Sequence, residues 1–423
     1  MPSAETNLAS SGRPLIVQKY GGSSVSTVDK IKAVARRIAG LSQTHRMVVV
    51  VSAMGDTTDD LFRMAREISD MPAERELDVL LSSGERISMA LLSMALKDLG
   101  ADSVSLTGSQ AGLLTDESHT RARILEVRPH RVQTALSLGK IVIIAGFQGV
   151  SREKKEITTL GRGGSDTSAV AFALALKAAR CEILTDVDSV CSADPRLVTS
   201  PVRYSQLPLG LVLEMACTGA QVMHARAIEM ARNHNLNLWL GPAHQQSSED
   251  QIRKGTLMSP DESFSVSELP KVVSVALRKN LSALSVNLTT EGLFYSELLA
   301  SAAQNKILVH DLISTSPQDG ERFGYLMVDE EESRQWLQTF LKNAQKISLL
   351  NMEKVHLFGL IGYHLEQNAE MYSRALEVFA EHGLRTALTH STHHGLRFYL
   401  HADQPLEAFN LALRSLHDRL ILG

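Results

Sequence analysis

The stretch "TTLGRGGSDTSAVAFALA", residues 158–175, decides the fold of the first half of this chain. Its second part is apolar on all sides, as in a helix that is buried in a core. Its first part places Arg162 between glycines, immediately before Ser165 and Asp166 begin the helix. Helix N-termini with nearby glycine amides bind anions, and arginine can hold a carboxylate or phosphate in a bidentate way. A helix cap would explain Ser165 or Asp166, but it gives no reason for the arginine.

Short apolar runs alternate with helical patterns on both sides of this stretch. The strand-like runs are "LIVQKY" (15–20), "MVVVVSAM" (47–54), "KIVIIAGF" (140–147) and "CEILTDV" (181–187). Helical spacing appears in "VDKIKAVARRIAGL" (28–41), "LFRMAREI" (61–68) and "ERISMALLSMALKDLG" (85–100), the last with Gly100 as a C-cap. Continuous apolar strands between helices predict an α/β domain over residues 14–260, with a mostly parallel central sheet sandwiched by helices.

Composition narrows the class of protein. The chain has 423 residues, of which 44% are hydrophobic and 21% charged, with a net charge of -4. These values predict a soluble globular protein with two or three domains. The sequence contains no basic block, so a nucleic-acid partner is not expected. It also contains no uncharged apolar run that is long enough to span a membrane. Three cysteines fit neither a disulfide framework nor a zinc site, so we expect a reducing cytoplasm. Residues 1–13 are expected to be a disordered tail.

The C-terminal part has a different pattern. A polar linker, "SPDESFSVSELP" (259–270), precedes two segments, residues 266–346 and 350–423, that each predict the order β-α-β-β-α. This is the core of an α+β ferredoxin-like module, and two copies side by side suggest a paired unit that senses small ligands. Two unrelated α+β segments are the alternative. The histidines of "THSTHHG" (389–395) favour a solvated hairpin over a metal site, and the metal ligands of the chain remain unknown.

Further polar loops follow the predicted strands of the first domain. "KYGGSS" (19–24) could be a phosphate cradle or a plain turn, and it lacks P-loop spacing. In "SAMGDTTDD" (52–60), Asp56 or Thr57 could simply cap the next helix. In "SSGE" (82–85), Glu85 could accept from a substrate ammonium or could favour a helix N-terminus. Because ligands bind at the carboxyl ends of the strands in such sheets, several loops of this kind indicate one site.

A last polar stretch, "LTDVDSVCSADPR" (184–196), ends another predicted strand. Thr185, Asp186 and Arg196 could hold a nucleotide base and its phosphates. A solvent-exposed turn is the alternative.

Eight motifs in order resemble one family. They are "VQKYGGSSV", "VVVVSAMGDTTDDL", "LLSSGERIS", "GSQAGLLT", "AGFQGV", "TTLGRGGSDTSAVA", "CEILTDVDSVCSADPR" and "GTLM". Together they closely resemble aspartate kinase, of the amino-acid kinase superfamily, over residues 14–260. The C-terminal repeats resemble the paired ACT domains of that family. The resemblance implies the amino-acid kinase fold and ATP-dependent phosphorylation of the L-aspartate β-carboxylate to 4-phospho-L-aspartate.

The resemblance also implies roles for individual residues. Residues expected to hold the ATP phosphates are Lys19, Gly21, Gly22 and Ser23. Those expected to bind aspartate are Ser52, Thr58, Glu85, Arg162 and Ser165, with Glu85 on the ammonium and Arg162 on a carboxylate. Asp166 would lie by the transferring phosphate and its Mg²⁺, and Thr185, Asp186 and Arg196 would sit at the nucleotide. Lys19, Arg162 and Asp166 are the expected catalytic residues.

The family further implies a cytoplasmic enzyme of lysine or threonine biosynthesis that dimerises through its ACT domains. Because the aspartate β-carboxylate is already ionised at pH 7, no general base is required. Catalysis would then consist of positioning and charge neutralisation.

Several positions depart from the family pattern. Gln221 replaces a lysine expected near the phosphates, and "DSVC" (188–191) replaces "DGVY". "WLGP" (239–242) stands in place of "VRSS". Both ACT turns, "LTTEGLFYSE" (288–297) and "GYHLEQNAE" (362–370), lack the usual glycine- and proline-bearing geometry. We therefore expect weak or altered feedback control.

Two other functions remain open. One is an amino-acid kinase that acts on glutamate or a related acid, although Glu85, Arg162 and the repeats favour aspartate. The other is a catalytically weak regulatory or partner paralogue, which Gln221 and the altered "DSVC" loop would suggest.

Overall fold

The computed structural model describes residues 12–244, 254–260, 271–315, 322–344, 350–366 and 368–422. Residues 1–11 of the predicted tail and 261–270 of the predicted linker lie outside this range. The chain forms two compact units. The first consists of Met1–Val190, Arg203–Val212 and Met223–Phe264, and the second of Cys191–Val202, Leu213–Val222 and Ser265–Gly423. Two short segments of the predicted first domain, 191–202 and 213–222, therefore group with the C-terminal repeats.

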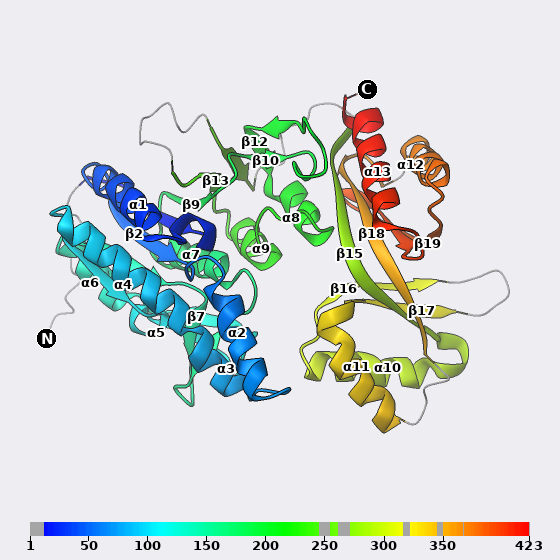
Figure 1. The fold of residues 1–423 in the computed structure, drawn as a ribbon, viewed down its shortest axis with the longest axis horizontal. Helices are drawn as coiled ribbons and strands as arrows, with labels where there is room; N and C mark the ends of the chain where they lie inside the picture. The colour runs from blue at the N-terminus through cyan, green and yellow to red at the C-terminus, as the bar shows by residue number, and fades with distance from the viewer. Residues whose placement is uncertain are drawn as a thin grey trace, which may run out of the picture. The chain divides into compact units, whose positions relative to one another are not determined.

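An eight-stranded sheet in the order β12-β14-β13-β9-β1-β2-β6-β3 forms the centre of the first unit (Figure 1). Its strands are β1 (Leu15–Tyr20), β2 (Arg46–Val51), β3 (Ser103–Leu106), β6 (Ile141–Ala145), β9 (Arg180–Thr185), β12 (Gln206–Pro208), β13 (Leu238–Pro242) and β14 (Thr256–Ser259). Only the β13–β14 pair is antiparallel among these neighbours. The predicted mostly parallel sheet is thus confirmed, and the carboxyl ends of β1, β2, β6 and β9 share one edge.

Helices cover this sheet because their apolar residues recur at helical spacing. The helices of the first unit are α1 (Val28–Leu41), α2 (Thr57–Ile68), α3 (Glu74–Leu81), α4 (Ser83–Asp98), α5 (Gly108–Ala111), α6 (His130–Ser137), α7 (Gly164–Ala175), α8 (Leu209–Cys217, shared between the units) and α9 (Ala225–Asn233). One core cluster joins α1 and α4 to β1 and β2. Thr27 caps α1 by accepting from the Lys30 amide, and Gly100 ends α4 with a φ of 78°, as predicted.

A second, four-stranded sheet supports the edge where the loops gather. Its order is β5 (Ile124–Val127), β4 (Leu113–Thr115), β7 (Gln148–Ser151) and β8 (Ile157–Thr159). Strand β8 leads directly into the "LGRGG" loop and α7. Helix α7 is buried from Gly164 to Ala173, as its all-round apolar pattern predicts.

The second unit confirms the predicted repeat of β-α-β-β-α. The first copy is β15 (Lys271–Asn287), α10 (Leu288–Gln304), β16 (Val309–Thr315), β17 (Phe323–Asp329) and α11 (Glu330–Ala344). The second copy is β18 (Asn351–Tyr363), α12 (Ala369–Glu381), β19 (Thr386–Thr392), β20 (Gly395–His401) and α13 (Leu406–His417), with a π-helical turn over Asp418–Leu422. Together they build one six-stranded sheet, β16-β17-β15-β18-β20-β19.

The two long strands of this sheet join the copies. Residues 271–278 of β15 pair with 357–363 of β18, and residues 281–285 of β15 pair with 351–355. The register shifts between Arg278 and Leu281. Each copy supplies three strands of its own. The fourth strand of each copy's sheet is one end of the long first strand of the other copy.

A buried ion-pair network ties the segment 213–222 to this sheet. Arg397 on β20 donates to Glu214 at 2.8 Å and to Asp311 at 2.6 Å. Tyr399 donates to the same Asp311. All three charged side chains are at most 11% exposed, so each needs its partners in the folded unit.

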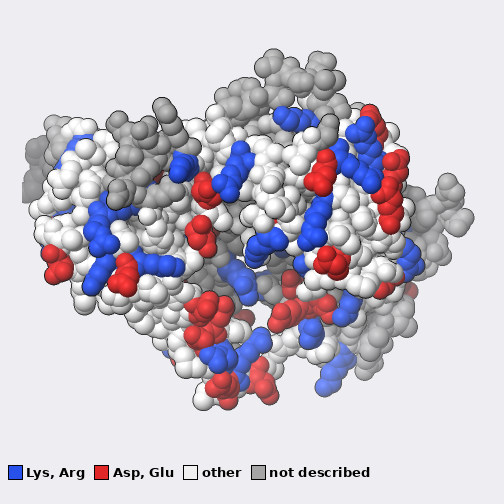
Figure 2. Space-filling view, turned by 45° about the horizontal axis from the view of Figure 1, so that its top comes forward, with Lys and Arg blue, Asp and Glu red and all other residues white. Residues whose placement is uncertain are grey.

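Charges of both signs are interspersed on the face that Figure 2 draws. One helical stretch among the described residues, Glu74–Asp98, is long and apolar enough to pass a test for membrane spans, but half of it is buried in this fold. It comprises α3, which packs against β8 of the four-stranded sheet, and α4, which packs against β3 and β6 of the central sheet.

Candidate functional site

The carboxyl end of β1 carries a nearly buried ion pair. Lys19 Nζ lies 2.8 Å from Asp166 Oδ1, and the two side chains are 13% and 11% exposed. Lys19 is held in register between β2 and β9, and Asp166 belongs to the first turn of α7. Asp166 Oδ2 also accepts from the His224 amide at 3.4 Å. Two predicted catalytic residues from distant parts of the chain therefore meet at one point.

The "KYGGSS" loop next to this pair is built for close backbone approach. The Gly21 amide donates to Leu184 O on β9, and the Gly55 amide donates to Gly22 O, both at 3.1 Å. A Cβ on Gly22 would lie 2.9 Å from Ala53 O, which no side chain tolerates. After this glycine the chain forms a 3-10 turn, Gly22–Val25. Ser23 is exposed there, and its carbonyl accepts from Lys30 Nζ at 2.8 Å.

Glu85 lies in the first turn of α4, against the loop that follows β2. Its Oε1 accepts from the Ala53 amide at 3.0 Å. Gly84 permits this approach, since a Cβ there would lie 2.7 Å from Ala53 Cβ. Glu85 is 3% exposed, and burial raises the pKa of its carboxyl to about 7. Within the described chain its Oε2 has no hydrogen-bond partner, so one oxygen is available to a ligand.

The alternative of a helix cap in "SAMGDTTDD" receives no support from the side chains. Asp56 occupies the N-cap position of α2 but makes no side-chain cap hydrogen bond. Thr57 Oγ1 donates back to Met54 O at 2.5 Å instead. Ser52 and Thr58 are partly exposed on either side of this turn.

The loop around Arg162 requires glycine on both sides. Gly161 and Gly163 have φ values of 77° and 66°, in the left-handed region. A Cβ on Gly163 would lie 2.2 Å from His224 Cβ. Arg162 itself is exposed, whereas Ser165 is 7% exposed and packs where a Cβ on Gly146, at the end of β6, would meet it at 2.9 Å. Helix α7 begins at Gly164, one residue before the predicted start.

Buried groups that the sequence analysis did not assign hold this loop in place. Arg226 on α9 donates to Leu160 O at 2.8 Å and to Ala122 O at 3.0 Å. Asp78 on α3 is fully buried and accepts from Thr159 Oγ1 at 2.5 Å. Burial raises the pKa of Asp78, and its hydrogen bonds oppose that rise. The available signal was a carboxylate on the apolar face of a helix, between Leu77 and Leu81.

The remaining predicted residues are divided between the units. Thr185 ends β9 beside Lys19's strand, and its Oγ1 donates to Asp186 Oδ1 at 2.9 Å. Arg196 belongs to the second unit, where it forms a bidentate pair with Asp194 and donates to Gln221 Oε1 at 3.3 Å. The structure therefore joins Lys19, the glycines, Glu85, Ser165, Asp166 and Thr185 at one sheet edge, while Arg196 has partners of its own.

The family model of the "amino acid kinase family" matches residues 14–241. The aspartokinase of Mycobacterium tuberculosis is 53% identical over 245 residues, which are 58% of this chain and 57% of that relative. The chain thus spans little more than half of that relative's length at this identity. The aspartokinase of Corynebacterium glutamicum is 36% identical over 417 residues, or 97% of this chain and 96% of the relative.

Solved structures agree on the fold. The crystal structure of E. coli aspartokinase III in complex with aspartate and ADP has a TM-score of 0.79 at 22% identity, and covers 97% of this chain and 100% of its own. Three findings point to the same family. They are the eight motifs, the site at the sheet edge and the relative that matches along nearly its whole length. The chain belongs to the aspartokinase family of amino acid kinases.

Proposed function

We propose that this chain transfers the γ-phosphoryl group of ATP to the β-carboxylate of L-aspartate and releases 4-phospho-L-aspartate and ADP. The observation that carries the proposal is the Lys19–Asp166 pair at 2.8 Å, set between the Gly21-Gly22 turn and the first turn of α7. This arrangement puts a fixed cation, a glycine turn and a helix N-terminus at one place. These are the groups that stabilise charge on transferring phosphates.

The acceptor site would be formed by two charges of opposite sign. Glu85 offers a buried oxygen that has no partner in the part of the chain that the structure describes, which suits the α-ammonium of an amino acid. Arg162, on its glycine-flanked loop, suits a carboxylate. A carboxylate oxygen of aspartate then attacks the γ-phosphorus in line while the bond to the ADP oxygen breaks. No proton has to be removed from the acceptor, because that carboxylate is ionised at pH 7.

The donor set also fits Mg²⁺. This ion usually takes one or two protein carboxylates together with phosphate oxygens, and Asp166 is such a carboxylate. Among the described residues no cluster of three metal-binding side chains exists, so most ligands would come from ATP and water. Bound Mg²⁺ would neutralise charge on the phosphates. Lys19, Gly21, Gly22 and Ser23 would hold those phosphates, and Thr185 and Asp186 the nucleotide.

The likeness to aspartokinases supports a proposal for the cellular context. We place the enzyme in the cytoplasm, at the first step of aspartate-derived amino-acid synthesis that leads to lysine and threonine. A homodimer that pairs through the ACT-like sheets is the expected assembly. Arg196 remains a proposed nucleotide ligand that would have to exchange its contact with Asp194 for one with ATP.

The direct test is a steady-state assay of the full chain with ATP, Mg²⁺ and L-aspartate, in which hydroxylamine traps the acyl phosphate. We expect turnover with aspartate and a much lower kcat/KM with L-glutamate. ATP binding without turnover on either acid would instead support the regulatory paralogue that Gln221 suggests.

Replacement of Arg162 by alanine tests the acceptor site. One charge-assisted hydrogen bond contributes about 1.5 to 3 kcal/mol. Its loss should therefore lower kcat/KM for aspartate roughly 10- to 150-fold. The KM for ATP should change little. Arg131→Ala, on the exposed side of α6, is the matched control. Unchanged aspartate kinetics in Arg162→Ala would rule out this role.

The raised pKa of Glu85 predicts a pH dependence. Since the ionised form binds the ammonium, the aspartate KM should fall as pH rises through about 7. The free energy of unfolding of the unliganded protein should instead decrease as pH rises. Burial favours the neutral form of the Glu85 carboxyl in the folded protein. The stability that goes with this neutral form is present at acid pH and is lost as pH rises through the folded pKa.

Glu85→Gln should remove both trends, while it raises the aspartate KM at every pH. Thermal unfolding measured between pH 4.5 and 7, and aspartate KM measured between about pH 6 and 8, provide the check. Identical pH profiles in the variant and the parent would contradict the assignment.

The altered ACT turn predicts weak feedback. Helix α10 follows β15 directly, and the Asn287 side chain already accepts from the Thr289 amide at 3.0 Å. The Leu288 amide donates to Arg322 O, so these two amides of the turn already have partners. We expect millimolar lysine plus threonine to inhibit by less than about twofold, below the usual allosteric coupling of about 1 to 3 kcal/mol. Initial rates at subsaturating aspartate measure this, and strong cooperative inhibition would refute it.

A further inference from the structure

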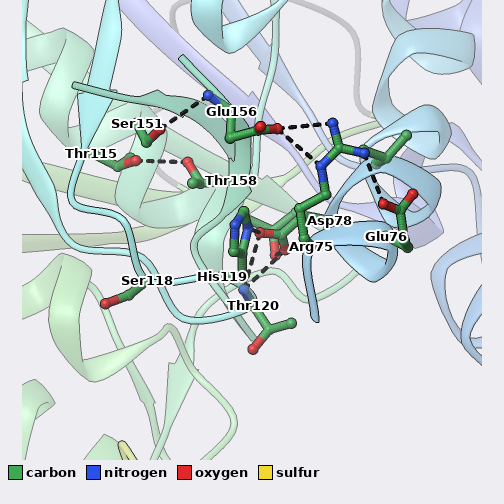
Figure 3. A network of polar contacts seen from close by, with 12 residues as sticks. Arg75, Glu76, Asp78, Thr115, Ser118, His119, Thr120, Ser151, Glu156 and Thr158 are labelled. Atoms are coloured by element: carbon green, nitrogen blue, oxygen red, sulfur yellow. Dashed lines mark hydrogen bonds and ion pairs between the residues drawn. The ribbon is translucent and has the colours of Figure 1, made fainter. Parts of the chain in front are cut away.

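The buried carboxylate of Asp78 joins three structural elements close to the loop that carries Arg162. Asp78, on α3, is 0% exposed. It accepts from His119 Nδ1 at 2.7 Å, from the Thr120 amide at 3.0 and 3.2 Å, and from Thr159 Oγ1 at 2.5 Å. Figure 3 shows Asp78 facing His119 and Thr120. Both of its oxygens are therefore used, by donors from a loop and from the end of β8.

The turn that Asp78 holds is strained. Thr120 has a φ of 62°, which is an outlier for a β-branched residue. The Arg121 amide donates to His119 O at 2.8 Å, which closes a three-residue turn around Thr120. A turn of this kind with positive φ at its centre is rare and persists only where its surroundings impose it. The charge-assisted bond from the Thr120 amide to Asp78 supplies that constraint.

The strained turn lies directly against the residue before Arg162. A Cβ on Gly161 would be 3.1 Å from Thr120 O and 3.6 Å from Arg121 Cγ. Thr159, the other donor to Asp78, lies two residues before Gly161, and its carbonyl accepts from the Ala122 amide at 2.9 Å. One carboxylate thus fixes the backbone on two sides of the segment that presents Arg162.

We propose that Asp78 is a positioning residue for Arg162, acting through the strained turn at Thr120 and through the Thr159 hydroxyl. The part of this that concerns aspartate binding rests on the proposed function. Asp78 touches no substrate itself. It sets where the guanidinium meets the acceptor carboxylate, and a misplacement of about 1 Å at such a group can reduce the rate about 100-fold.

The first experiment uses Asp78→Asn in the full chain. The amide group of asparagine turns a donor toward the donors of this site, so the turn should lose its constraint. We expect the aspartate KM to rise about tenfold or more, the factor that corresponds to one lost charge-assisted hydrogen bond, while the dissociation constant for ADP stays within about twofold. Parent-like aspartate kinetics would overturn the proposal.

A second readout needs no substrate. Arg162 is exposed, so trypsin can cut the Arg162–Gly163 bond. Asp78→Asn should accelerate this cut about tenfold relative to cuts elsewhere in the first unit, because the loop opens more often. If the parent chain is inactive on aspartate but this cut is still accelerated, the proposed function fails and the positioning role stands. If the cut is unchanged, the positioning role fails.

The decisive variant is Asp78→Asn with Thr120→Gly. Glycine adopts positive φ without strain, so the turn should persist without Asp78. Both the aspartate KM and the rate of the tryptic cut should return part of the way to the parent values. A merely structural role of Asp78 predicts no such rescue, and a double variant no better than Asp78→Asn would overturn the proposal.

Two further variants complete the design. Arg75→Ala breaks an exposed pair with Glu156 that joins α3 to the chain just before β8, next to the same elements. It should leave both readouts unchanged, because exposed pairs contribute little. If Asp78→Asn does not fold, Thr159→Val decides, since it removes only one donor. A selective, smaller effect of Thr159→Val supports the proposal, and parent-like values overturn it.

Discussion

The ion pair between Lys19 and Asp166 is the interaction on which the site depends. Each charge is nearly buried, so each would be costly to the folded state without the other. The pair joins the carboxyl end of the central strand β1 to the first turn of the buried helix α7. It can form only if α7 packs on the sheet, and this packing also brings Ser165 beside Gly146. The fold thereby concentrates a cation, a carboxylate and the first turn of a buried helix at one place.

Glycines make this arrangement possible by letting backbones approach. Gly22 touches the loop after β2, and Gly84 brings the start of α4 against Ala53. Their positions explain why Glu85 can sit buried with one oxygen on an amide and the other without a hydrogen-bond partner among the described residues. Burial raises the pKa of this carboxyl. Such a pKa suits a carboxyl whose ionised form is stabilised when a cationic ligand binds.

The second unit applies another constraint. Its two copies share the long strands β15 and β18, so neither sheet is complete without the other copy. The Arg397 network then binds segment 213–222 to β20 and β16. Because this segment is part of α8 and the loop after it, helix α8 contributes residues to both units. At the turn that opens α10, the Leu288 and Thr289 amides have partners within the described chain.

The sequence by itself determined the element types, the parallel sheet, the repeat and the motif residues. It could do so because apolar periodicity and glycine-rich strand ends are local signals. It did not indicate Asp78, because a carboxylate between leucines reads as one polar position on an amphipathic helix. Only the tertiary structure decided that Asp78 faces Thr120 and Thr159. Such pairings depend on which distant elements pack together, and no local pattern encodes them.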